Sequence, residues 1–128
     1  MTTLELLAPA KNLSCGLAAI DHGADAVYIG AQRFGARASA GNSLEDITEL
    51  CSYAHQYGVK VYVTVNTIIY DEELDETRKL LADLQVAGVD AFLVQDLGLV
   101  AFASTVSSIA TGSQLHVYLF FGLLINYF

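Results

Sequence analysis

Helix-spaced apolar positions alternate with short apolar runs over the first hundred residues of the chain. Residues 17–30, 51–65 and 81–96 share one pattern: helix-spaced apolar residues, a glycine, one polar residue, then a short apolar run. A glycine that tolerates a left-handed backbone commonly closes a helix, and a continuous apolar run indicates a strand buried on both faces. The pattern therefore predicts a repeated helix–turn–strand unit. Its glycines are Gly23, Gly58 and Gly88.

The repeat and its flanks predict an alternating order of elements. Asn12 and Ser43 precede two of the expected helices and are suited to cap them. Strands are expected at 4–7, 26–29, 60–65 and 91–94, helices at 13–22, 44–57, 72–87 and about 97–110, and a fifth strand is an option at 114–121.

Alternating strands and helices of this spacing indicate an α/β fold with a parallel sheet and helical cover. An open doubly wound sheet and a (β/α) barrel share this local pattern, and the nearly regular repeat favours the barrel. A complete barrel needs about 250 residues, and the chain has 128. We therefore expect parallel (β/α) units forming about half of a TIM-barrel-like fold over residues 1–113, followed by an apolar tail at 114–128.

Composition and charge narrow the classes of protein to which this chain could belong. The formal net charge is −8, which argues against a surface that coats nucleic acid. The first residues lack the basic and apolar segments of a secretory signal, and the apolar tail is shorter than the ~20 residues of a membrane span. Cys15 and Cys51 are interpreted as reduced, helix-buried thiols of a cytoplasmic protein, with too few ligands for a metal site.

Polar residues gather where the expected strands end. Because ligands of parallel α/β folds bind at the carboxyl ends of the strands, these residues are the candidate binding site. Arginine matches carboxylates and phosphates with paired hydrogen bonds, although ion pairs of Arg33 or Arg37 with Asp96 or Glu45 would explain the same pattern. Asp96 suits acid–base work or capping of the following helix. The candidates are Lys11, Arg33, Arg37, Asn42, Asn66, Gln95 and Asp96.

The histidines and strand tyrosines have simpler explanations. His22 and His55 lie near the ends of expected helices, where a backbone hydrogen bond or the helix dipole suits them. His116 could join the binding edge if 114–121 is a strand, or lie in the core. Tyr28 and Tyr62 are expected to pack within the sheet.

Four segments resemble the amino-terminal part of the collagenase-like peptidase family U-thirty-two (peptidase U-32), almost continuously over residues 4–99. They are ELLAPAKNL (5–13), HGADAVYIGAQRFGARASAGNS (22–43), YAHQYGVKVYVTVNTIIYDEEL (53–74) and GVDAFLVQDLGL (88–99).

The resemblance implies a barrel-like domain of a cytoplasmic protein that is a peptidase or acts in hydroxylation of tRNA, ribosomal RNA or a ubiquinone precursor. It places seven residues on family motif positions at the strand ends: Pro9, Lys11, Arg37, Asn42, Asn66, Gln95 and Asp96. It also implies an iron–sulfur cluster held by cysteines downstream of this region, and a small anionic ligand or RNA as partner of the intact protein. No cofactor is expected in residues 1–128 themselves.

The sequence departs from the family after Leu115-His116-Val117, where Tyr118-Leu119-Phe120 stand in place of the usual Ser-Thr-Gln. We therefore expect a truncated member that is inactive alone and prone to self-association through open sheet edges. One alternative is a module that binds a dicarboxylate such as prephenate through the loop of Arg33 and Arg37. The other is a fragment without function.

Overall fold

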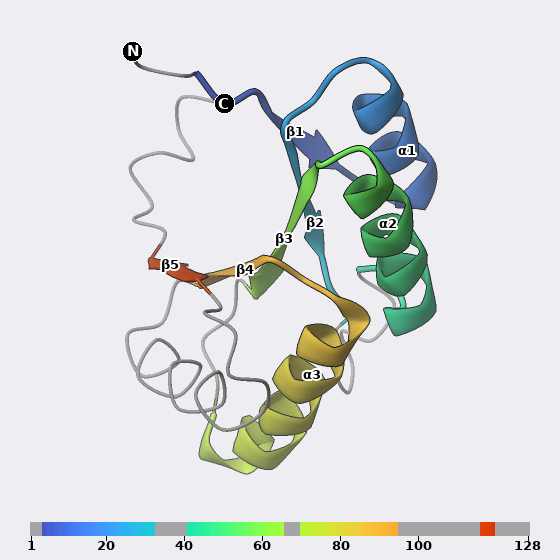
Figure 1. The fold of residues 1–128 in the computed structure, drawn as a ribbon. Helices are drawn as coiled ribbons and strands as arrows, with labels where there is room; N and C mark the ends of the chain where they lie inside the picture. Colours follow the sequence, from blue (N-terminus) through green and yellow to red (C-terminus); the bar gives the residue numbers. More distant parts are fainter. Residues whose placement is uncertain (1–3, 33–40, 66–69, 95–115, 120–128) are drawn as a thin grey trace.

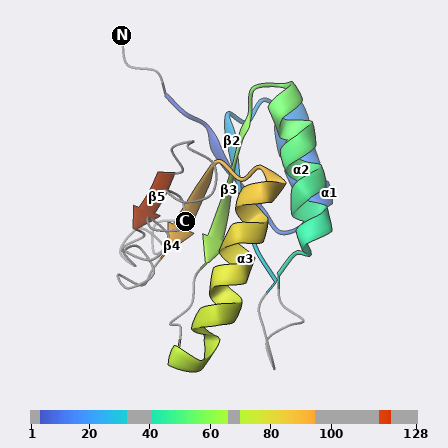
Figure 2. The ribbon, with the colours of Figure 1, turned by 60° about the horizontal axis from the view of Figure 1, so that its bottom comes forward.

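The computed structural model describes residues 4–32, 41–65, 70–94 and 116–119. Three helices lie against one face of a curved sheet (Figures 1 and 2). The elements are β1 (Leu7–Ala10), α1 (Leu13–Asp21), β2 (Ala26–Gly30), α2 (Leu44–Gln56), β3 (Lys60–Val65), the 3-10 turn η2 (Asp71–Glu73), α3 (Leu74–Ala87), β4 (Ala91–Val94) and β5 (His116–Leu119).

The strand order separates the two folds that the sequence left open. The sheet runs β1-β2-β3-β4-β5, and each neighbouring pair is parallel. A doubly wound sheet reverses its strand order at a switch point, whereas a barrel adds strands in chain order. The described sheet is therefore a run of consecutive barrel strands. The optional fifth strand is confirmed at 116–119, and the helix expected at about 97–110 falls outside the described residues.

The first strand was misplaced by the sequence analysis. It was expected at 4–7, but the ladder pairs Leu7 with Ala26 and Pro9 with Tyr28, and Leu4 is 95% exposed. Proline cannot donate a ladder hydrogen bond, yet an edge strand has one side on which that donor is not needed. Pro9 therefore lies inside β1 and not beyond its end.

The three repeat glycines close their helices in the same way. Gly23, Gly58 and Gly88 have φ of 95°, 69° and 100°, the left-handed region that suits glycine. After α1, the N–H of Ala24 donates to the carbonyl of Ala19 at 3.0 Å, the paired-bond ending known as the Schellman motif. The corresponding bonds after α2 and α3 run from Val59 to Ala54 and from Val89 to Leu84.

Carboxylates fasten the turns at the amino ends of the strands. Asp25, just before β2, accepts the Leu6 N–H at 2.8 Å, and Asp90, just before β4, accepts the Val61 N–H at 2.8 Å. His55 Nε2 lies 2.8 Å from the same Asp90 oxygen. Each carboxylate thus ties the start of its strand to the neighbouring strand, so this end of the sheet has a structural role.

The sheet has two distinct faces because side chains alternate along each strand. The outward face packs on the helices and forms the main core, in which Ile29, Val63 and Phe92 are almost fully buried. The inner face carries a separate cluster of Ala26, Tyr62, Ala91 and Leu93, with Tyr28 packed against it. The expected packing of Tyr28 and Tyr62 is confirmed.

Candidate functional site

The carboxyl ends of β1 and β2 are joined by one buried side chain. Asn42 is 8% exposed, and its Nδ2 donates to the carbonyl of Lys11 at 3.2 Å and to that of Gly30 at 3.0 Å. Lys11 follows β1 and is exposed, while Gly30 ends β2. Of the predicted site residues, the structure thus brings Lys11 and Asn42 together. Both amide hydrogens of Asn42 serve the fold, which leaves its oxygen as the group for a ligand.

The same residues hold the two ends of the loop after β2. The N–H of Asn42 donates to Gly30 at 3.0 Å, and the N–H of Gln32 donates to the carbonyl of Asn42 at 2.8 Å. Gly41 has φ of 109°, and a Cβ there would lie 2.3 Å from the carbonyl oxygen of Ala31. Only glycine fits this close approach. The segment 33–40 therefore leaves and returns at the carboxyl end of β2.

The remaining predicted site residues lie outside the described residues. Arg33 and Arg37 fall in the segment 33–40, Asn66 directly follows β3, and Gln95 and Asp96 directly follow β4. Their roles, and the alternative ion pairs with Glu45 or Asp96, remain predictions from the sequence.

His116 does not lie at this edge. The ladder pairs His116 with Ala91 and Leu119 with Val94, so His116 begins β5 at the amino end of the sheet. Of the two options for His116, the one at the binding edge is wrong, because the parallel register fixes which end of the strand it occupies.

Helix α2 starts beside the candidate site. Ser43 caps it by accepting the Asp46 N–H at 3.2 Å, and Asn12 caps α1 by accepting the Cys15 N–H at 2.9 Å. A cleft of about 300 Å³ lies between this start and α3. Its lining combines the loop ends with apolar helix residues: Ala31, Gln32, Asn42, Ser43, Leu44, Glu45, Ile47, Leu80 and Leu84.

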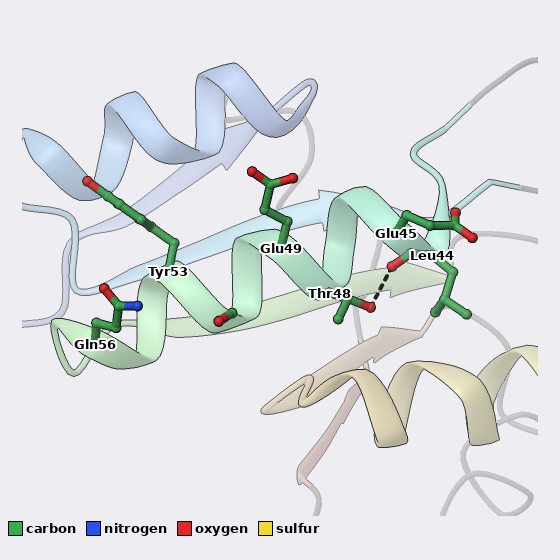
Figure 3. A pocket seen from close by; sticks show the side chains of 7 residues that line it. Leu44, Glu45, Thr48, Glu49, Tyr53 and Gln56 are labelled. Atoms are coloured by element: carbon green, nitrogen blue, oxygen red, sulfur yellow. Dashed lines mark hydrogen bonds between the residues drawn. The ribbon is translucent and has the colours of Figure 1, made fainter.

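A larger hollow of about 700 Å³ lies on the outer face of α2 (Figure 3). It is lined by residues of that one helix, among them Glu45, Glu49 and Tyr53, and the Thr48 hydroxyl donates to Leu44 at 2.7 Å. The Tyr53 hydroxyl donates to Asp21 of α1 at 2.6 Å, which raises the pKa of Tyr53. The Tyr53–Asp21 bond joins two helices on the outside of the sheet, away from the strand ends.

The histidines of the described segments do not form a nucleophile–base pair. His22 Nδ1 lies 2.7 Å from the carbonyl oxygen of Ala18, and His55 is held by Asp90 at the amino end. Burial, with Asp90 nearby, raises the pKa of the Cys51 thiol to about 12. A protonated thiol is a poor nucleophile, so Cys51 is a core residue as expected. Cys15 was also expected to be buried, but it is exposed on α1.

The cysteines present do not suit an iron–sulfur cluster. Such a cluster commonly takes four thiolates, whereas this sequence has two cysteines, one exposed on α1 and one on the buried side of α2. Within residues 4–32, 41–65, 70–94 and 116–119, no group of three or more His, Cys, Asp or Glu could hold a metal ion. No step of the chemistry is therefore assigned to a cluster on these residues.

One feature of the inner face near this edge was not predicted from the sequence. Gly30 and Thr64 are ladder partners at the carboxyl end of the sheet, and Thr64 was not among the predicted site residues. A signal was present, since both follow strand tyrosines by two positions and therefore share their face.

None of the helices that the structure describes is long and apolar enough to span a membrane.

Comparison with solved structures supports the barrel assignment. A type I 3-dehydroquinate dehydratase from Clostridium difficile superimposes with a TM-score of 0.62 at 14% identity, over 89% of this chain and 51% of that chain. At that identity the likeness concerns the fold alone. The chain therefore has the parallel (β/α) architecture of about half a TIM barrel.

Sequence relatives carry two kinds of name. The 23S rRNA 5-hydroxycytidine C2501 synthase of Escherichia coli is 55% identical over 96 residues, 75% of this chain and 15% of that protein. The tRNA hydroxylation protein P1 of Bacillus subtilis is 45% identical over 66% of this chain and 21% of its own length. A collagenase of Porphyromonas gingivalis is 32% identical over 88% of this chain and 28% of its own length.

The chain thus spans between 15% and 28% of the length of these three relatives. The model of Peptidase family U32 matches residues 11–117, which include β2, β3, β4 and the loop that Asn42 closes. This chain belongs to peptidase family U32.

Proposed function

We propose that this chain is the amino-terminal barrel segment of an RNA-hydroxylating member of the family. The observation that carries the proposal is the identity of 55% to a protein named as an rRNA 5-hydroxycytidine synthase, against 32% to one named as a collagenase. The RNA, the iron–sulfur cluster of the intact protein and a cytoplasmic location belong to this proposal.

In this function, the carboxyl edge of the sheet holds the reacting groups. Lys11 is exposed where β1 ends, and the loop that contains Arg33 and Arg37 starts and ends beside Asn42. Cationic side chains there would bind phosphate or carboxylate groups. Asn66, Gln95 and Asp96 would complete the edge from β3 and β4. Asn42 acts chiefly by positioning this loop.

The test is a chimera in which this chain's segment replaces the matching 96 residues of the Escherichia coli relative. It is expressed in cells that lack that relative, and 5-hydroxycytidine in 23S rRNA is measured by mass spectrometry. We expect the modification to return, and Arg37→Ala in the chimera to lower it by about tenfold or more, as for loss of a charged hydrogen bond. A chimera with the collagenase segment serves as the matched control. A stable, soluble chimera that makes no 5-hydroxycytidine would refute the proposal.

A second candidate function is binding of a small dicarboxylate such as prephenate. The exposed position of Lys11 at the carboxyl edge favours it, since barrel ligands bind there. Calorimetry with prephenate and a neutral analogue should give heat of binding for prephenate alone, which Lys11→Ala and Arg37→Ala each reduce. Equal heats for both compounds would exclude this function.

A further inference from the structure

The inner face of the sheet carries two tyrosines in one row and a glycine beside a threonine in the next row toward the carboxyl edge. The ladder aligns Pro9, Tyr28, Tyr62 and Ala91 in one row across four strands. Tyr62 is 7% exposed, packs with Tyr28, and its hydroxyl donates to Glu5 at 3.1 Å. Two aromatic rings thus fill this row, which forms a floor across the inner face.

The next row toward the edge holds the large side chain of Leu93 on β4 and only small residues on β2 and β3. It aligns Gly30 with Thr64, and Thr64 with Leu93. Gly30 and Thr64 are half-buried. A Cβ built on Gly30 would meet only the Thr64 hydroxyl oxygen within 4 Å among the described residues, at 3.5 Å. Among the described residues, the inner-face side of Gly30 therefore meets only a hydroxyl, in the row next to the two tyrosine rings.

This position is where barrels hold their substrates. Active sites lie at the carboxyl end of the strands, above the packed layers of the interior. Gly30 has no positive φ that would demand glycine, so backbone conformation does not explain it. Gly30 is the last residue of β2, and a glycine there lets a ligand or another backbone come close to the main chain.

We propose that Gly30 and Thr64 form the seat of the substrate base, a pyrimidine ring that lies against the Gly30 backbone and hydrogen-bonds the Thr64 hydroxyl. The inference rests on the proposed function, because an enzyme that modifies a base must take it out of its stack into a pocket. A hydroxyl both donates and accepts, so Thr64 can pair with a ring nitrogen or an exocyclic group. The tyrosine row below limits how deeply the ring enters.

The test uses the full 128-residue chain, labelled with ¹⁵N and titrated with cytidine or with ribose. We expect the amide resonances of Gly30 and Thr64 to shift saturably with cytidine and not with ribose. Thr64→Val, which keeps the shape but removes the hydroxyl, should weaken binding about fivefold, whereas Thr64→Ser should keep it within about twofold. No saturable shift up to about 10 mM cytidine, or equal shifts with ribose, overturns the proposal.

Gly30→Ala supplies a second perturbation that the fold should tolerate. Its methyl group would lie 3.5 Å from the Thr64 hydroxyl, an ordinary contact, but it would occupy the surface assigned to the ring. We expect at least tenfold weaker cytidine binding with an unchanged spectrum elsewhere, and unchanged binding contradicts the seat.

The same substitutions in the chimera separate the two proposals. If the unmodified chimera makes 5-hydroxycytidine while Thr64→Val and Gly30→Ala make as much, the base seat is wrong and the proposed function stands. If the chain binds cytidine through Gly30 and Thr64 but the folded chimera makes none, the proposed function fails and the seat remains.

Discussion

Replacing Asn42 with alanine should remove the side chain that joins the ends of β1 and β2. The Asn42 Nδ2 donates to Lys11 and Gly30 at 3.2 and 3.0 Å, and the residue is 8% exposed. The backbone bonds of Asn42 with Gly30 and Gln32 survive the substitution. The carbonyl of Lys11 loses its amide donor, and the segment 33–40 loses part of its anchor.

The size of the effect follows from these contacts. A buried intramolecular hydrogen bond contributes about 1 kcal/mol net, and a carbonyl left without a partner adds to the loss. We therefore expect Asn42→Ala to lower the free energy of unfolding by about 2–3 kcal/mol. At about 2.1 cal/mol/K per residue, a 128-residue chain should lose about 7–11 °C in Tm.

Urea unfolding followed by far-UV circular dichroism would measure the change. Asn12→Ala is the matched control, because Asn12 is exposed and makes one cap bond, to the Cys15 N–H at 2.9 Å; its loss should be about 1 kcal/mol. An Asn42→Ala loss equal to or below that of Asn12→Ala would show that the junction does not hold the two strands together.

Asn42→Asp tests the direction of these bonds. A carboxylate would face two carbonyl oxygens, which raises the folded-state pKa of the introduced group above its unfolded value of about 3.9. A raised folded pKa means that stability is retained below the unfolded pKa and lost as pH rises through the folded value. The stability gap to the wild type should therefore widen from about pH 4 to pH 7, and a constant gap would contradict the donor assignment.

Two further predictions concern the turns and the thiols. Gly41→Ala should lower the free energy of unfolding by more than about 3 kcal/mol, since its Cβ would lie 2.3 Å from the Ala31 oxygen. Gly23→Ala has open space around it and should cost only the strain of a left-handed backbone, about 1–2 kcal/mol. Equal urea midpoints for the two variants would refute the close contact between residue 41 and Ala31. Native chain treated with iodoacetamide at about pH 8 should be alkylated at Cys15 and not at Cys51, because Cys51 is buried with a pKa raised to about 12. By the same linkage, the stabilising effect of the Cys51 thiol is present below its ordinary pKa of 9.0 and is lost as pH rises toward 12. Rapid labelling of Cys51 would contradict its burial. A Cys51→Ala variant whose stability changes with pH above 9 as that of the wild type does would contradict the role of the thiol.

The helix ends show how far local sequence can reach. Gly23, Gly58 and Gly88 were expected to close helices, and each does so with positive φ. Asn12 and Ser43 were expected caps and both accept the expected N–H. These features depend on a few consecutive residues, so the pattern along the chain is enough to place them.

The site itself was only partly predictable. Asn42 was a candidate ligand, but its amide instead ties together carbonyls that lie 31 and 12 residues away, partners that no local pattern identifies. The strand predicted at 4–7 was placed too early along the chain, because Pro9 can lie inside β1 only as part of an edge strand. The position of Gly30 beside Thr64 became visible only when the register of β2 and β3 aligned them.

The sequence by itself thus determined the alternation of strands and helices, the helix ends, the capping residues and the family motifs, since each depends on neighbours along the chain. Only the tertiary structure decided the strand order that makes the sheet part of a barrel and the junction at Asn42. It also placed His116 away from the carboxyl edge. These depend on which strands pair and in which register, and that pairing is fixed by contacts between residues far apart in the sequence.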